Sequence, residues 1–386
     1  MPFLAVLIAA LIALALPAAA QEKQAEPDFQ TSAPHAIVMD ATTGEVFFEK
    51  DADTTFEPAS MSKLMTMVMT FEAIRRGDLK EDDLLTITED AWRRGGAPSG
   101  GSTMYAELNS KVAVSDLIKG TIIQSANDAA ITLATRLGGT EEAFAAKETE
   151  RARELGLKKS VFRNSTGLPD PDHVSTAREL AMLARYIIET FPEYYKLYGT
   201  REFTWNRITQ KNRNPLLGTV DGADGMKTGY TSKAGYGLIG SATRDGRRLI
   251  IVVAGLDTAQ ARAKEAQNLI EQGFKKYRRF DILTAGDTLV TARVWGGERG
   301  SVKLMAREPM KALLTDAERS AARVKVVYKG PLIAPVSKET AVGVAKLVVG
   351  DAEIGEVPVF PKQDIGARDG VIGRSLDTLG VWVFGG

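Results

Sequence analysis

The order in which strand-like and helix-like patterns follow one another constrains the fold of this chain most. Near the start, HAIVMDATTGEVFFEKDAD alternates apolar and polar residues around a Thr-Gly turn, which predicts a β-hairpin. From about residue 80 to 190 the apolar spacing is mostly helical, and strand-like runs return after Lys227 on both sides of an Asp-Gly turn. Strands separated by a helical insertion predict an α+β sheet domain that carries an all-α subdomain.

Beyond about Arg279 the pattern changes to short alternating strands with Gly-Asp and Pro turns, and no long helix separates them. This pattern predicts a small β-sandwich. We therefore expect two domains, at residues 21–278 and 279–364. The last segment, 365–386, mixes large apolar residues with charged ones. It is compatible both with a peripheral contact on a membrane surface and with packing on the sandwich.

The N-terminus has the composition of a secretory signal. An apolar run from Phe3 to Leu16 is followed by Pro17 and three alanines, the small-residue pattern that signal peptidase cleaves. The run is shorter than the roughly 20 residues of a membrane-spanning helix, which favours a cleaved signal over an anchor. The start is atypical of a signal peptide in one respect, because the α-amine is the only positive charge before the run. We therefore expect residues 1–20 to be a signal peptide and the mature protein to be exported to the periplasm.

Composition excludes several kinds of function. Lys and Arg number 49 and so do Asp and Glu, and this balance does not suggest nucleic acid or another polyanion as a partner. The absence of cysteine excludes disulfides, thiolate zinc sites and a cysteine nucleophile. The only histidines are His35 and His173, so a serine hydrolase with a histidine base has two candidates. Nothing in the sequence implies a metal or an organic cofactor.

The stretch PASMSKLMT places Ser60 and Lys63 three residues apart on a helix that we expect from about Ser60 to Arg76, ended by Gly77. Positions i and i+3 share a helix face, so the two side chains can meet. A lysine with an ordinary pKa of ~10.4 is a poor base, but burial or a second cation lowers that pKa. The neutral amine can then deprotonate the serine. The alternative is a solvated lysine, and we expect the methionine-rich stripe of this helix to pack in the core.

Two further short motifs follow along the chain. In IIQSANDAA, Ser125 could relay a proton to a leaving amine and Asn127 could hold a substrate carbonyl and Lys63, unless the motif is only a cap or turn. In GMKTGYT, Lys227 and Thr228 would offer a cation and a hydroxyl to a carboxylate at the start of a strand.

The KTG motif suggests two more roles. We expect Gly229 to leave room for a substrate that lies along the strand edge. Lys227 is a candidate for the second cation that lowers the pKa of Lys63. The alternative for KTG is an ordinary turn.

The three motifs occur in the order SxxK, SxN, KTG, separated by about 60 and 100 residues. Together they are the signature of penicillin-binding proteins and active-site serine β-lactamases. The chain resembles the low-molecular-mass penicillin-binding proteins, which are serine-type D-Ala-D-Ala carboxypeptidases. The resemblance covers about residues 35–275, including NSTGLPDPDHVSTARELAML and ITQKNRNPLL, and a β-rich C-terminal segment. It implies a β-lactamase/transpeptidase-like fold for the sheet domain.

The resemblance also implies roles. Ser60 attacks the carbonyl between the two terminal D-alanines of a peptidoglycan stem peptide, Lys63 is the base, and water hydrolyses the acyl-Ser60 ester. Backbone N–H groups of Ser60 and Tyr230 form the oxyanion hole. Ser125 and Asn127 support proton transfer and substrate placement.

The remaining implied roles concern ligand binding. Lys227, Thr228 and Arg213 bind the terminal carboxylate of the substrate. β-Lactams acylate the same serine.

Two departures from the family pattern stand out. Position 230 is tyrosine where many relatives have histidine, so pH dependence and β-lactam turnover could differ. The terminal segment is less bulky and less basic than the membrane-binding helix of the family. His173 matches a family position, but the serine–lysine logic leaves it no catalytic role, and we interpret it as structural.

Three alternatives remain. A class A β-lactamase would have a deacylating glutamate after SxN, but Glu141, Glu142, Glu148 and Glu150 lie in helix-like runs. A transpeptidase or endopeptidase acting on cross-links shares all three motifs. A non-catalytic wall-binding or β-lactam-sensing protein would have a broken motif set, whereas this set is intact.

Overall fold

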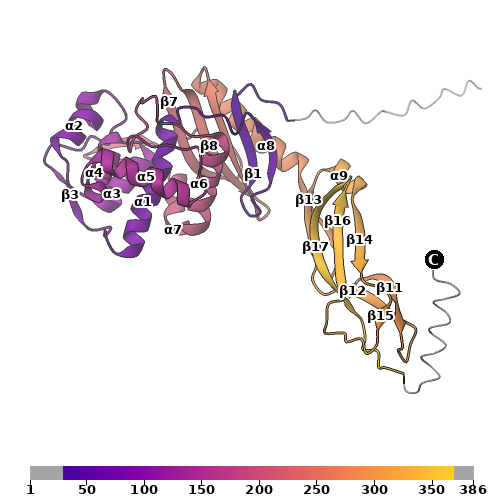
Figure 1. Ribbon diagram of the computed structural model, residues 1–386. Coiled ribbons are helices and arrows are strands. Elements are labelled where there is room, and N and C mark those ends of the chain that lie inside the picture. The colour runs from indigo at the N-terminus through magenta and orange to yellow at the C-terminus, as the bar shows by residue number, and fades with distance from the viewer. Residues whose placement is uncertain (1–28, 369–386) are drawn as a thin grey trace, which may run out of the picture.

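The computed structural model describes residues 29–368. Figure 1 shows two domains that meet at the end of a long helix, with the second domain extending away from the first. The predicted signal peptide and the terminal segment from residue 369 onward lie outside the described residues. Within these residues, no helix is both long and apolar enough to cross a bilayer.

The first domain is built on a five-stranded antiparallel sheet in the order β2-β1-β9-β8-β7. Its strands are β1 (His35–Asp40), β2 (Val46–Lys50), β7 (Ala223–Thr231), β8 (Gly235–Arg244) and β9 (Arg247–Leu256). Because β1 pairs with β9, the segment between β2 and β7 is an insertion into one sheet. The predicted α+β organisation is confirmed.

The insertion forms the helical subdomain. Its helices are α1 (Lys63–Arg76), α2 (Glu89–Gly95), α3 (Val114–Ile123), α4 (Asn127–Gly138), α5 (Glu141–Glu154), α6 (Ala177–Thr190) and α7 (Pro192–Tyr195). Short 3₁₀ turns are η1 (Ala59–Ser62), η2 (Ala97–Ser99) and η3 (Lys196–Gly199), and two small ribbons pair β3 (Leu84–Thr86) with β4 (Lys111–Ala113) and β5 (Glu202–Trp205) with β6 (Ile208–Lys211). As predicted, α1 ends at Gly77, which adopts the left-handed φ of 82°.

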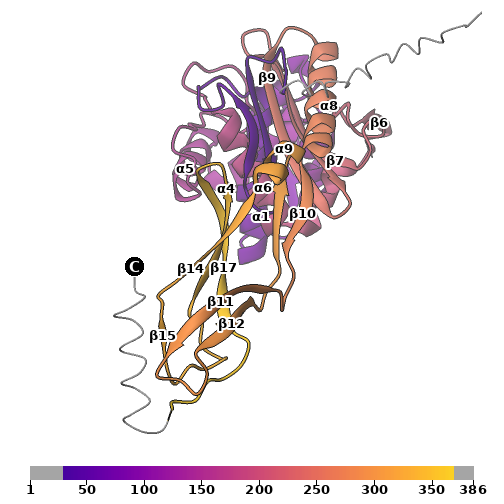
Figure 2. The same ribbon diagram turned by 90° about the vertical axis from the view of Figure 1, so that its right-hand side faces the viewer.

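Both faces of the sheet are covered, which explains why β9 reads as a continuous apolar run. Leu249 and Ile251 join the core beneath α8 (Ala259–Lys276), whereas Ile250 and Val252 join the core shared with the helical subdomain. Figures 1 and 2 show α8 on one side of the sheet and the helical subdomain on the other.

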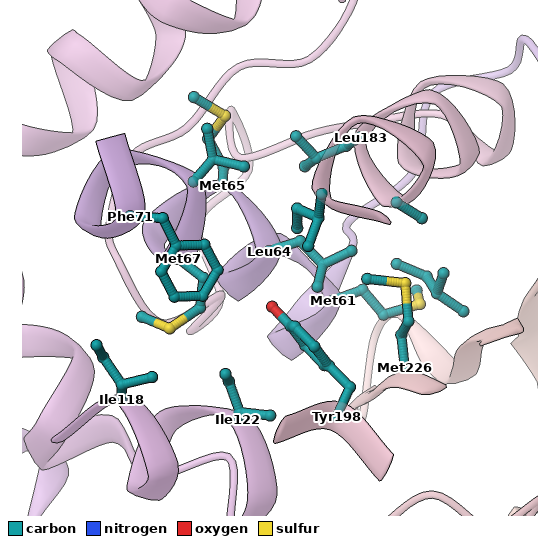
Figure 3. Close-up of a cluster of buried hydrophobic side chains, with 14 of the residues drawn as sticks. Met61, Leu64, Met65, Met67, Phe71, Ile118, Ile122, Leu183, Tyr198 and Met226 are labelled. Atoms are coloured by element: carbon teal, nitrogen blue, oxygen red, sulfur yellow. The ribbon is translucent and has the colours of Figure 1, made fainter. Parts of the chain in front are cut away.

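The apolar stripe of α1 lies at the centre of the subdomain core. Figure 3 shows Met61, Met65, Met67 and Phe71 among residues of the surrounding helices and strands. All four side chains are almost completely buried. The prediction that the methionine-rich stripe packs in the core is confirmed, and this packing fixes the helix that begins at the SxxK motif.

The second domain is β-rich and has its own apolar core. Its elements are β10 (Arg278–Leu283), β11 (Thr288–Trp295), β12 (Ser301–Ala306), β13 (Met310–Leu314), α9 (Asp316–Ala321), β14 (Arg323–Tyr328), β15 (Leu332–Ile333), β16 (Gly343–Val349) and β17 (Ala352–Pro361). A six-stranded sheet in the order β14-β16-β17-β12-β11-β15 shares that core with the β10-β13 pair. The predicted sandwich is confirmed.

Candidate active site

Ser60 and Lys63 meet where η1 runs into α1. The Lys63 side chain is completely buried, Ser60 is partly exposed, and Lys63 Nζ lies 3.0 Å from Ser60 Oγ. The structure thus confirms that the two side chains of SxxK meet and excludes a solvated lysine.

Three oxygen atoms surround the Lys63 amine. Besides Ser60 Oγ, these are Asn127 Oδ1 at 2.8 Å and the Thr166 carbonyl oxygen at 2.6 Å. Two of the three can only accept hydrogen bonds, whereas the serine hydroxyl can also donate. A neutral amine, with two N–H donors and one lone pair, would donate to Asn127 and Thr166 and accept from Ser60. The arrangement therefore suits a base aimed at Ser60.

The electrostatic environment favours this neutral form. Burial, followed by the positive charge of Arg213, lowers the pKa of Lys63 from 10.5 to about 7, against the opposing charges of Glu141 and Asp128. Arg213 is therefore a cation that assists burial, and the like charges of Lys63 and Lys227 also interact, so the role of Lys227 as a second cation stays a prediction.

Lys227 is also a buried lysine. Its side chain is 3% exposed, and its Nζ has a contact of 3.5 Å with the Thr228 carbonyl. Burial and the charges of Lys63, Arg213 and Arg262 hold its pKa well below the usual value. Lys227 is thus itself disfavoured as an ammonium ion.

The SxN motif occupies the tight connection between α3 and α4. Ser125 takes a left-handed φ of 60°, and its side chain is 2% exposed. Among the described residues its hydroxyl has no hydrogen-bond partner. Asn127 begins α4 and contacts Lys63, so the motif does more than terminate a helix.

The KTG motif lies within β7, which is an edge strand of the five-stranded sheet. A Cβ atom on Gly229 would lie 2.8 Å from the Pro58 carbonyl oxygen and 3.1 Å from Met61 Cγ. The missing side chain thus lets β7 pack against the turn that carries Ser60. The prediction that Gly229 also leaves room for a substrate along the strand edge stays a prediction.

A groove of about 760 Å³ joins the three motifs. It is lined by Ser60, Gly100, Gly101, Ser102, Ser125, Asn127, Gly167, Leu168, Arg213, Thr228, Gly229, Tyr230, Thr231, Tyr236 and Arg262. Every predicted site residue except Lys63 and Lys227 is in this lining, and those two lysines lie buried behind it. The described lining contains two arginines and no carboxylate, so the groove suits an anionic ligand.

Several groove residues were not predicted. Arg262 comes from α8, where the sequence shows only an ordinary amphipathic helix, and Ser102 accepts a hydrogen bond from Arg213 at 2.6 Å. Tyr236 stacks on Tyr230 with ring centroids 4.2 Å apart. The Thr166 carbonyl is a backbone atom, so no residue type could have indicated it.

His173 and the candidate glutamates lie outside the groove lining. His173 is 2% exposed, packs edge-on against Phe162 and accepts a hydrogen bond at Nδ1 from the Arg163 N–H at 3.3 Å. Burial lowers the pKa of His173 from 6.5 to about 4. These contacts agree with a structural role. Between residues 29 and 368 no His, Asp and Glu cluster is arranged to hold a metal ion.

The chain resembles known proteins over nearly its whole length. The D-alanyl-D-alanine carboxypeptidase family profile matches residues 20–258, and the profile of the penicillin-binding protein 5 C-terminal domain matches residues 277–367. The D-alanyl-D-alanine carboxypeptidase DacC of Escherichia coli is 36% identical over 344 residues, 88% of this chain and 86% of that protein. The chain belongs to the D-alanyl-D-alanine carboxypeptidase family.

Solved structures of the family share the fold. The structure of penicillin-binding protein 5 from Haemophilus influenzae superposes with a TM-score of 0.71 at 34% identity, covering 88% of this chain and 99% of that one. Penicillin-binding protein D2 of Listeria monocytogenes, in its ampicillin-bound form, has a TM-score of 0.58 at 34% identity and covers 64% of this chain and 100% of its own. The predicted family, fold class and serine peptidase class are confirmed.

Proposed function

We propose that this protein removes the terminal D-alanine from peptidoglycan stem peptides through an acyl-Ser60 intermediate. The observation that carries the proposal is the position of the Lys63 amine, which is buried and lies 3.0 Å from Ser60 Oγ. Burial lowers the pKa of this amine to about 7. Such an amine is partly neutral at physiological pH and can act as a general base.

In the acylation step, Lys63 Nζ takes the Ser60 proton and Oγ attacks the carbonyl carbon of the penultimate D-alanine. The tetrahedral oxyanion accepts hydrogen bonds from the backbone N–H groups of Ser60 and Tyr230. The C–N bond then breaks, and the leaving amine receives a proton through Ser125. Water, deprotonated by Lys63, hydrolyses the ester and restores the serine.

The groove supports recognition of a terminal carboxylate. Arg213 and Thr228 line it, Lys227 lies behind Thr228, and the described lining has no acidic side chain. Because β7 is an edge strand, a substrate peptide can bind alongside it as an added strand. β-Lactams, which the ampicillin-bound relative binds, would acylate Ser60 by the same route.

The remaining parts of the chain fit an enzyme of the cell envelope. We assign residues 1–20 to a signal peptide, 21–278 to the catalytic domain and 279–364 to a domain that spaces or docks it. The substrate lies outside the cytoplasm, so we place the mature enzyme in the periplasm. Residues 365–386 would make a peripheral contact with the membrane, which co-sedimentation with anionic lipid vesicles would test.

The direct test measures D-alanine released from diacyl-Lys-D-Ala-D-Ala by purified residues 21–386 and by its Ser60→Ala variant. Release by the parent and by Ser320→Ala, a matched change in α9, with none from Ser60→Ala, is the expected result. No release by the parent would contradict carboxypeptidase activity on this peptide. The same variants assayed on cross-linked muropeptides would then show whether the enzyme is an endopeptidase.

A further inference from the structure

The backbone oxygen that holds Lys63 is itself held in place by a buried carboxylate. Thr166, whose carbonyl lies 2.6 Å from Lys63 Nζ, follows Ser165 directly. Glu141 Oε1 accepts hydrogen bonds from the Ser165 N–H at 3.0 Å and from Ser165 Oγ at 2.6 Å. The carboxylate of the first residue of α5 therefore fixes the peptide segment that presents an acceptor to the amine.

The same carboxylate is fixed on its other side. Glu141 Oε2 lies 2.7 Å from Arg94 of α2, and the Glu141 side chain is 4% exposed. A buried carboxylate with three hydrogen-bond or ion-pair contacts has one defined orientation. The chain of contacts therefore runs from Arg94 through Glu141 and Ser165 to the carbonyl that contacts Lys63.

A second buried acid, Glu148, is linked to the same peptide segment through Thr66. Thr66 Oγ1 lies 2.8 Å from the Ser165 carbonyl oxygen and 2.8 Å from Glu148 Oε1. The hydroxyl has one proton, and a protonated Glu148 would let it donate to the carbonyl while it accepts from the acid. Burial raises the pKa of Glu148 well above its usual value, in agreement with a protonated acid. Glu141 differs from Glu148 in having a cationic partner, Arg94.

We propose that Glu141 is a positioning residue for the general base: it fixes the Ser165–Thr166 peptide, whose carbonyl contacts Lys63. The inference rests on the proposed role of Lys63 in acylation. It assigns a function to a glutamate that does not line the groove and cannot reach a substrate there. A purely structural role, an acid at a helix N-terminus, is the competing explanation.

The charge of Glu141 acts on Lys63 within a defined set of ionisable neighbours. Arg213 lowers the pKa of Lys63, and Glu141 and Asp128 raise it. Lys63 in turn lowers the pKa values of Lys227 and His173. Loss of the Glu141 charge should therefore lower the pKa of Lys63 further and leave the amine neutral at more acidic pH.

The test compares Glu141→Gln, Glu141→Ala and the matched control Glu142→Gln, which changes the exposed neighbouring residue. The rate constant for acylation by a fluorescent penicillin is measured from pH 5 to 10, together with the melting temperature. We expect Glu141→Gln to keep the maximal rate within about threefold and to move the acid limb of the profile to lower pH. We expect Glu141→Ala to lower the maximal rate about 10- to 100-fold, because the Ser165 contacts are lost.

Either of two results would overturn the inference: an acid limb of Glu141→Gln that coincides with that of Glu142→Gln, or a maximal rate of folded Glu141→Ala equal to that of the parent. If Glu141→Ala does not fold, the acid limb of the isosteric Glu141→Gln decides alone. A parallel Lys63→Arg variant separates the two proposals. If it acylates at the parent rate, the role of Lys63 as the base fails, whatever the Glu141 variants do.

Discussion

The two domains bury different kinds of side chain. The first domain buries ionisable groups close to its groove, among them Lys63, Asp128, Glu148 and Lys227, whereas every buried side chain in the described core of the second domain is apolar. Buried charges oppose stability unless they are paired, so their concentration in the first domain indicates that the catalytic site lies there. The first domain is therefore organised around ionisable groups and the second around apolar packing.

The largest effect should come from removing the neutral amine that serves as the base in the first domain. Lys63→Arg keeps a cation but cannot supply a neutral amine, since an arginine stays protonated. We expect acylation by penicillin to fall about 10²- to 10⁴-fold, the usual contribution of a general base. Lys264→Arg, an exposed position of α8, is the matched control and should react as the parent does. Acylation by Lys63→Arg at the parent rate would remove the contrast between the domains.

The second domain should respond to loss of packing instead. Leu304 in β12 is completely buried in the apolar core, and a large-to-small change there typically costs about 2–5 kcal/mol. We expect Leu304→Ala to lower the unfolding temperature of this domain in calorimetry and to leave the acylation rate unchanged. A parallel loss of acylation would mean that the domains are coupled, and the comparison would then fail.

His173 should make the first domain sensitive to acid. Its pKa is lowered from 6.5 to about 4 in the fold, so the neutral ring is the stable form. The contribution is fully present above about pH 6.5 and is lost as the pH falls toward 4, by about 3 kcal/mol in total. His173→Asn, whose side-chain oxygen can still accept from the Arg163 N–H, should unfold with less pH dependence across this window. Identical pH dependence in urea unfolding would contradict this assignment.

The smallest expected effect concerns the contact between β7 and the Ser60 turn. In Gly229→Ala the new methyl group would meet the Pro58 carbonyl oxygen and displace the strand. Overpacking of this kind costs about 1–3 kcal/mol, which corresponds to a roughly 5- to 150-fold slower acylation if the whole cost falls on the active site. Gly355→Ala, with no heavy atom within 4 Å of the new Cβ, is the control. Unchanged acylation in Gly229→Ala would show that this close contact has no catalytic consequence.

The sequence predicted the parts of the molecule that depend on local patterns. Alternation and helical spacing indicated the sheet, its helical insertion and the β-rich second domain, because each pattern reports which face is buried. SxxK was informative for the same reason: two residues one turn apart on a helix must be neighbours. The proximity of Ser60 and Lys63 follows from the helix alone and does not depend on the rest of the fold.

The remaining features depend on contacts that are distant along the chain. Arg213 acts on Lys63 although it lies far along the chain, and the low pKa of Lys63 depends mainly on burial that no local pattern reports. The Thr166 carbonyl contacts the base, and the Glu141 carboxylate contacts the neighbouring Ser165, through residues about 80 to 100 positions away from Lys63. The need for glycine at position 229 arises from the close packing of β7 against η1, which the sequence does not indicate.

The pH dependence of Ser60 acylation tests the central claim most directly. The measurement is the second-order rate constant for acylation of residues 21–386 by a penicillin, from pH 5 to 10. Its pH profile should show an acid limb with an apparent pKa near 7, the value to which burial lowers the pKa of Lys63. An acid limb near the ordinary lysine value of ~10.4 would contradict the account, because the buried amine would then be charged at physiological pH.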